Sequence, residues 1–136
     1  IVPYAGRFET LGSTVMVAWD DSREAARAVA DALPLLRRAG QVHVLGWDEH
    51  GDADARLRLR LEAVQTWLKR HGIAARVHLE RTEIDIADAM LSRASDLGAD
   101  LIVMGAYGHV RWVQRMFGGA TRGLLASMTV PVLMSR

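Results

Sequence analysis

The sequence predicts an α/β fold in which an open, five-stranded parallel sheet is doubly wound by helices. Short apolar segments alternate with longer segments of helical periodicity, and parallel strands require such long crossovers. Leu101–Met104 is a run of four large apolar residues without polar alternation, a pattern typical of a strand that helices cover on both faces. Glycines near the ends of the helical segments separate the two kinds of element.

The first strand and the first helix are predicted from residue type and from a capping pattern. Thr14–Trp19 is apolar and contains β-branched residues, which favours a strand. The segment 21–24 fits a capping box with Asp21 as its N-cap, and the Ala-rich helix that follows runs toward Arg38. Pro34 lies inside this helix, so we expect a kink or an early end to its regular hydrogen bonding.

Apolar periodicity predicts the other elements. One helical face recurs at spacings of four, three and four residues and ends before Gly72; it comprises Leu57, Leu61, Val64 and Leu68. The next helix is capped by Asp85 and ended by Gly98, with a buried stripe at Ile86, Met90 and Ala94. The remaining predictions are strands at Gln41–Trp47, Ala75–Glu80, Asp100–Met104 and Val130–Ser135, and a last helix at Gly119–Met128.

Length and composition limit the classes of function. With 136 residues, half of them hydrophobic, the chain suits one domain with its own core. Seventeen basic and sixteen acidic residues give a net charge of +1, so no nucleic-acid surface is predicted. No apolar run approaches the roughly 20 residues of a membrane helix, so no membrane partner is expected. Without cysteine or a signal-peptide pattern, we expect a soluble, cytoplasmic protein.

Residues 1–13 are predicted to lie outside the domain, which we place at residues 14–136. The stretch begins with an apolar segment that contains Pro3 and continues as a polar, glycine-bearing sequence. Two interpretations stay open. The stretch is either a linker from a preceding sister domain in a tandem protein or a short N-terminal arm.

A glycine-bearing segment after the fourth predicted strand indicates a binding site. Gly105 and Gly108 follow this strand directly, and Gly118 and Gly119 precede the last helix. Unpaired backbone N–H groups of such a loop and of a helix N-terminus can face one point, which suits an anion such as phosphate. Ligands of open α/β sheets bind beyond the carboxyl ends of the strands at the switch point. We expect the first and fourth strands to flank that point, which brings Asp20 beside the glycine loop.

The spacing of Gly105, Gly108 and Gly118 resembles the Gly-x2-Gly-x9-Gly motif of nucleotide-binding universal stress proteins. The resemblance covers residues 14–136 and includes the acidic end of the first strand and a closing Val-Pro-Val-Leu segment. It implies a Rossmann-like sheet in the order 3-2-1-4-5 and a regulatory role in the stress response. It also implies dimerisation through the last strand and, in a subset of the family, binding of ATP or AMP.

The resemblance further implies a set of nucleotide contacts. The adenine lies near Ala18, Asp20 and the backbone of Gly46, and the ribose lies near Met104 and Gly105. The phosphates, with Mg²⁺, lie among Gly108, Gly118, Gly119, Ala120 and Thr121. ATP is the expected ligand, with AMP or ADP as alternatives.

The chain departs from the motif at Gly119, where nucleotide binders carry Ser or Thr. A hydroxyl donor is lost there while the backbone N–H remains, and one neutral hydrogen bond contributes roughly 0.5 to 1.5 kcal/mol. The change weakens phosphate binding without abolishing it, and Thr121 compensates for part of the loss.

Simpler interpretations compete with a binding site. Gly105 and Gly108 also suit a tight turn with positive φ, and Asp20 suits an N-cap, a role equally natural for Asp21. No serine or carboxylate accompanies His109 in the sequence, so no catalytic residue and no enzyme are predicted, although slow ATP hydrolysis stays open. No two histidines have metal-ligand spacing, so no protein metal site is expected.

Two functions therefore remain. The first is a regulatory module that binds an adenine nucleotide, and the second is an interaction module with a vestigial pocket. Val130–Met134 is expected to form a sheet edge, and an exposed apolar edge invites pairing. We expect it to pair with a second copy, giving a homodimer, or with a tandem sister domain.

Overall fold

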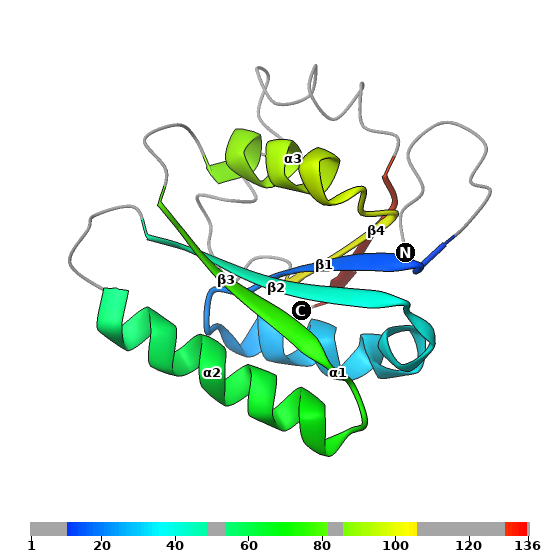
Figure 1. The fold of residues 1–136 in the computed structure, drawn as a ribbon, viewed down its shortest axis with the longest axis horizontal. Coiled ribbons are helices and arrows are strands. Elements are labelled where there is room, and N and C mark those ends of the chain that lie inside the picture. The colour runs from blue at the N-terminus through cyan, green and yellow to red at the C-terminus, as the bar shows by residue number, and fades with distance from the viewer. Residues whose placement is uncertain (1–10, 49–53, 82–85, 106–129, 136) are drawn as a thin grey trace.

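A computed structural model of the chain describes residues 11–48, 54–81, 86–105 and 130–135 (Figure 1). Its helices and strands follow one another in the predicted order. They are β1 (Thr14–Ala18), α1 (Arg23–Arg38), β2 (Gln41–Asp48), α2 (Asp54–Arg70), β3 (Ala75–Arg81), α3 (Ile86–Leu97), β4 (Leu101–Gly105) and β5 (Val132–Ser135). The predicted helix at Gly119–Met128 lies outside the described residues.

The described strands form one parallel sheet in the order β3-β2-β1-β4-β5, which confirms the predicted fold and strand order. Helices α1 and α2 cover one face of the sheet, and α3 covers the other (Figure 1). An apolar core lies on each face of the sheet, and alternate residues of β1 pack into one core or the other. Val15 and Val17 pack with α1 and α2, whereas Met16 and Ala18 pack with α3.

The first turn of α1 corrects the predicted cap. Ser22, not Asp21, is the N-cap, because its backbone is extended and its Oγ accepts a hydrogen bond from the Ala25 N–H at 3.0 Å. Asp21 has a φ of 60°, a left-handed conformation in which it turns the chain from β1 into the helix. Asp20 is not the N-cap either. The Asp20 Oδ1 atom accepts from the Ser22 N–H at 3.0 Å and so supports the cap from outside.

Pro34 does not end α1 early, because the helix continues to Arg38. The proline has no N–H for the carbonyl of Ala30, one turn earlier. Both Ala30 and Pro34 are exposed, so water is available to that carbonyl. The predicted early end of the helix was therefore wrong, because the proline lies on the solvent side of α1.

Helices α2 and α3 follow their predicted apolar stripes. Leu61, Val64 and Leu68 of α2 are buried against the sheet, and Met90 and Ala94 of α3 are buried on the other face. Both helices end before a glycine in the left-handed conformation, as predicted. Those glycines are Gly72, with φ 78°, and Gly98, with φ 65°.

The fifth strand starts later than predicted, at Val132 instead of Val130. Pro131 lacks an N–H, but its carbonyl accepts the Ile102 N–H at 3.0 Å and so starts the pairing with β4. The bridge partner of Ile102 is Val132, so the parallel pattern directs the N–H groups of Val132 and Met134 away from β4.

Hydrogen bonds of Asp100 join the start of β1 to the start of β4. Its carboxylate accepts the backbone N–H groups of Gly12, Ser13 and Thr14 at 3.1, 2.9 and 3.0 Å. The carbonyl of Ser13 in turn accepts the N–H groups of Gly40 and Gln41 at 2.8 and 3.1 Å. Gly12 and Ser13, the last residues of the predicted arm, are thus bonded to the sheet, whereas residues 1–10 lie outside the described part.

Candidate functional site

The carboxyl edge of the sheet between β1 and β4 is the candidate site. These strands are paired neighbours, with Val15 opposite Leu101 and Val17 opposite Val103. The strand order reverses direction between them, which is where ligands of open α/β sheets bind. Five predicted site residues lie in the described part: Ala18, Asp20, Gly46, Met104 and Gly105. The others, Gly108, Gly118, Gly119, Ala120 and Thr121, lie outside it.

Gly105 lies directly against the first turn of α1. A Cβ atom placed on it would lie 2.5 Å from the Ala25 nitrogen and 2.7 Å from the carbonyl carbon of Glu24. Those atoms belong to the backbone, so they cannot move aside as a side chain would. The φ of Gly105 is not positive, so the tight-turn explanation was wrong for this glycine. Glycine is required here because the end of β4 and the N-terminus of α1 meet.

The loop between β1 and α1 completes this edge of the site. Besides the bond from Asp20 to Ser22, the Asp21 carboxylate pairs with Arg60 of α2, with Oδ2 and Nη1 3.1 Å apart. The positive φ of Asp21 is uncommon for a residue other than glycine, although Asp tolerates it better than most. The capped N-terminus of α1, the Asp20 carboxylate and the end of β4 therefore lie close together, whereas the Asp21 carboxylate is directed toward α2.

Ala18 and Met104 are buried in the core on the α3 side, with 1% and 0% of their surface exposed. Their side chains pack among apolar neighbours. What these two positions can offer to a ligand at the carboxyl edge is their backbone.

Gly46 is explained by the packing of α2. A Cβ atom on Gly46 would lie 3.1 Å from Leu57 Cδ1 and 3.3 Å from both Cδ atoms of Leu61. The missing side chain lets α2 approach β2 closely. Gly46 also lies two residues before the end of β2, so its role in packing is visible in the structure and its predicted role beside adenine remains a prediction.

A surface groove of about 320 Å³ lies between α1 and α2, next to the candidate site. Trp19 and Trp67 contribute its aromatic wall, Val29 and Val64 its aliphatic wall, and the Arg60–Asp21 ion pair lies beside them. None of the five described site residues lines it. The groove therefore borders the switch point without coinciding with it.

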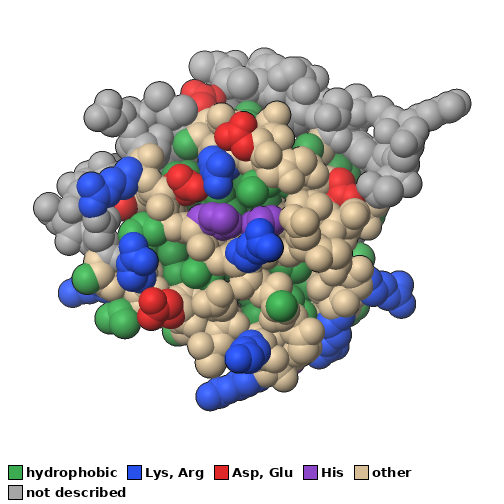
Figure 2. All heavy atoms as spheres, viewed as in Figure 1, with side chains coloured by type: hydrophobic (Ala, Val, Ile, Leu, Met, Phe, Trp, Pro, Cys, Tyr) green, Lys and Arg blue, Asp and Glu red, His purple; other side chains and the backbone are tan. Residues whose placement is uncertain are grey.

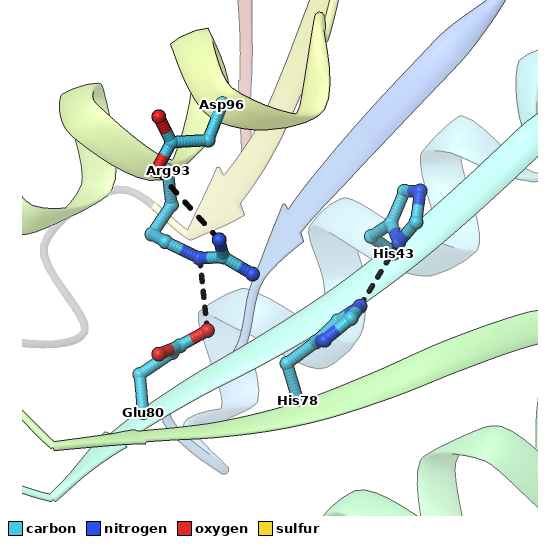
Figure 3. A network of polar contacts seen from close by, with 5 residues as sticks. All are labelled: His43, His78, Glu80, Arg93 and Asp96. Atoms are coloured by element: carbon cyan, nitrogen blue, oxygen red, sulfur yellow. Dashed lines mark hydrogen bonds and ion pairs between the residues drawn. The ribbon is translucent and has the colours of Figure 1, made fainter.

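A polar network on the α3 side of β2 and β3 was not predicted (Figure 3). His43 Nδ1 lies 3.0 Å from His78 Nε2, and His43 Nε2 lies 3.2 Å from Gln41 Oε1. Farther along β3, Glu80 pairs with Arg93 of α3 at 2.8 Å. Burial is the main cause that lowers the pKa of both His43 and His78, and nearby positive charge lowers it further.

The two histidines are 35 positions apart in the chain, so no local spacing revealed them. The available signal was the alternation of polar residues along each strand, combined with the pairing of β2 and β3. In that register His43 lies opposite Arg76 and His78 opposite Leu45, which makes the histidines diagonal neighbours.

Two kinds of feature are absent from the described residues. No group of three or more His, Asp or Glu side chains there is arranged to hold a metal ion. No helix in the same residues has the length and apolar character needed to cross a membrane.

Comparisons with known proteins agree with this architecture. The sequence model described as "Universal stress protein family" matches residues 13–136. A family member from Burkholderia pseudomallei is 28% identical over 90% of this chain and 94% of its own, with a TM-score of 0.66. A universal stress protein from Archaeoglobus fulgidus DSM 4304 is 26% identical over 93% of this chain, which spans 44% of that protein, with a TM-score of 0.69.

A further structure shares the fold and holds a ligand. It is the universal stress protein from Archaeoglobus fulgidus in complex with dAMP, which is 23% identical over 90% of this chain and 97% of its own, with a TM-score of 0.68. A search of curated protein sequences finds no match.

Proposed function

The chain belongs to the universal stress protein family, and we propose that it is a regulatory module that binds an adenine nucleotide at the carboxyl edge between β1 and β4. The observation that carries the proposal is the contact of Gly105 with the first turn of α1. It brings the start of the glycine loop to a helix N-terminus and to Asp20, at the switch point where this class of sheet binds ligands. The relative crystallised with dAMP supports an adenine nucleotide as the ligand class.

Each part of the site has a chemical role in this proposal. The Asp20 carboxylate accepts a hydrogen bond from the adenine end of the ligand, and its bond to Ser22 holds it in place. The ends of β1 and β4 offer backbone groups at Ala18, Met104 and Gly105. The backbone N–H groups of the glycine loop would hold the phosphates, as the sequence motif predicts, and Mg²⁺ would come bound to the phosphate oxygens. ATP is the proposed ligand, with ADP or AMP as alternatives, and its turnover is slow or absent.

A charge-removing variant tests this assignment. Asp20→Asn keeps an oxygen that accepts from Ser22 but loses the negative charge, so we expect it to weaken nucleotide binding by about tenfold, which corresponds to roughly 1.4 kcal/mol. Isothermal titration measures the affinity. Glu62→Gln removes the same charge from an exposed position on α2 and should bind like the wild type. Equal affinities of all three proteins would remove Asp20 from the site.

Gly119 favours a second function, an interaction module with a vestigial pocket, because this residue lacks the hydroxyl that phosphate binders carry. In this proposal β5 pairs with a second copy of the chain, as a homodimer, or with a tandem sister domain. The outward N–H groups of Val132 and Met134 offer the hydrogen bonds for such pairing.

Two proline variants of β5 distinguish the pairing of two chains from the pairing of β5 with β4. Met134→Pro removes an N–H that points away from β4, so the domain should fold while the dimer dissociates. Leu133→Pro is the matched contrast, because position 133 directs its N–H toward β4 and its loss weakens the sheet itself. Sedimentation velocity measures the assembly. A dimer that persists in folded Met134→Pro would show that β5 is not the interface.

A further inference from the structure

The histidine pair has a defined arrangement of protons. Gln41 Oε1 is an acceptor, so the His43 Nε2 atom opposite it carries the hydrogen. In neutral His43 the Nδ1 atom is then a bare acceptor, and the hydrogen bond of 3.0 Å must come from the His78 Nε2–H. His78 keeps Nδ1 as its unprotonated nitrogen. The chain of donors therefore runs from His78 through His43 to Gln41.

This arrangement accepts one proton more easily than two. A first proton binds His78 at Nδ1, which leaves the hydrogen bond intact and makes its donor positively charged. A second proton must bind His43 at Nδ1, where it would place two N–H groups head to head across 3.0 Å. The unfolded chain has no such restriction, since both of its histidines take up protons below about pH 6.5.

The two arginines near the pair oppose extra positive charge, and Glu80 offsets part of their effect at His78. Arg76 and Glu80 come from β3, and Arg93 and Asp96 come from α3, where Arg93 pairs with Glu80 at 2.8 Å and lies 3.7 Å from Asp96. β1 contributes Met16, an apolar core residue, to this face of the sheet. His43 is only 4% exposed, whereas His78 is partly exposed, and histidines are visible at the centre of the surface in Figure 2.

We propose that the His43–His78 pair is an acid-sensitive clamp that holds the edge strand β3 to β2. Among the described strands β3 pairs with β2 alone, and α3 contacts β3 through the Glu80–Arg93 ion pair. On the opposite face, α2 contributes a hydrogen bond from Gln65 to the Ala75 carbonyl at 2.8 Å. Local opening of β3 releases both histidines to take up protons, so acid favours the open state.

The direction of the pH effect follows from the lowered pKa of both histidines. Below about pH 6.5 the open strand binds more protons than the closed strand, so the closed state loses stability as the pH falls toward the folded pKa values. Above about pH 6.5 both states are neutral at these positions, and the clamp is fully formed. One proton of difference changes the opening equilibrium by at most about tenfold per pH unit.

Native-state hydrogen exchange of the full chain at pH 7.5 and pH 5.5 tests the clamp. After correction for the intrinsic exchange rate, the opening constant of the β3 amides bonded to β2 should be at least about fivefold larger at pH 5.5. These amides should also open more readily than those of β1 and β4 at pH 5.5. His78→Gln should reduce the acid effect to less than half, and His71→Gln, which changes a histidine outside the pair, should leave it unchanged.

Three results would overturn the proposal. They are no acid effect on β3, an equal effect in His78→Gln and the wild type, and β3 opening only together with β1 and β4. A measurement on the wild type alone covers the case in which His78→Gln does not fold. The ring C–H signals of His43 and His78 should titrate below about pH 6.5, the value of an unperturbed histidine, and titration of both at or above that pH would contradict the clamp.

Discussion

At the residue scale, two glycines of the sheet are required for different reasons. A Cβ atom added to Gly105 would lie 2.5 Å from the backbone nitrogen of Ala25 in α1. A Cβ atom added to Gly46 would lie 3.1 to 3.3 Å from the ends of leucine side chains. Leucine methyl groups can rotate away, but a helix backbone can move only as a unit. The two positions therefore tolerate a methyl group to different degrees.

Alanine substitution measures this difference. Gly105→Ala should cost about 3 kcal/mol or more of unfolding free energy, because the first turn of α1 must shift, and Gly46→Ala should cost about 1 kcal/mol. Urea unfolding measures both values. Gly105→Ala should also weaken nucleotide binding, because the α1 N-terminus borders the proposed site. Similar costs for the two variants would contradict the close contact at Gly105.

At the element scale, hydrogen bonds at the start of the strands fix the central pair of the sheet. The Asp100 carboxylate accepts hydrogen bonds from the three successive backbone N–H groups of residues 12–14. The Thr14 carbonyl accepts a hydrogen bond from the Asp100 N–H at 2.9 Å. The amino ends of β1 and β4 are thus joined by hydrogen bonds, and the candidate site lies at their carboxyl ends. These hydrogen bonds and the proposed binding site lie at opposite edges of the sheet.

Asp100→Asn tests this separation. An amide can accept at only one of its two positions, so the variant should lose about 1 to 2 kcal/mol of unfolding free energy. Nucleotide affinity should stay within about twofold of the wild type, since the change lies at the far edge of the sheet. Glu62→Gln again controls for the lost charge. A large loss of affinity at unchanged stability would contradict the assignment of the two edges.

At the scale of the whole molecule, the sequence predicted what depends on local pattern. The apolar run at Leu101–Met104 and the stripes of α2 and α3 led to a doubly wound parallel sheet, and the resemblance supplied its strand order. The N-cap was misplaced because Asp21 and Ser22 are both good capping residues, and only the backbone conformation distinguishes them.

Features that depend on contacts across the sheet were not predictable from one sequence. The His43–His78 pair depends on the register between β2 and β3, and the need for glycine at 105 depends on how closely α1 approaches β4. In the candidate site, the structure brings Asp20 and Gly105 to the same end of α1. The side chains of Ala18 and Met104 are buried in the core, so only their backbone is available to a ligand at this edge. The phosphate contacts remain predictions from the motif.

Isothermal titration of ATP with Mg²⁺ into the purified chain tests the central claim most directly, beside a Gly108→Val variant that fills the predicted phosphate loop. The account predicts binding in the micromolar range, a stabilisation of the fold by ligand, and the loss of both in the variant. No heat and no thermal shift at millimolar ATP in the wild type would contradict nucleotide binding.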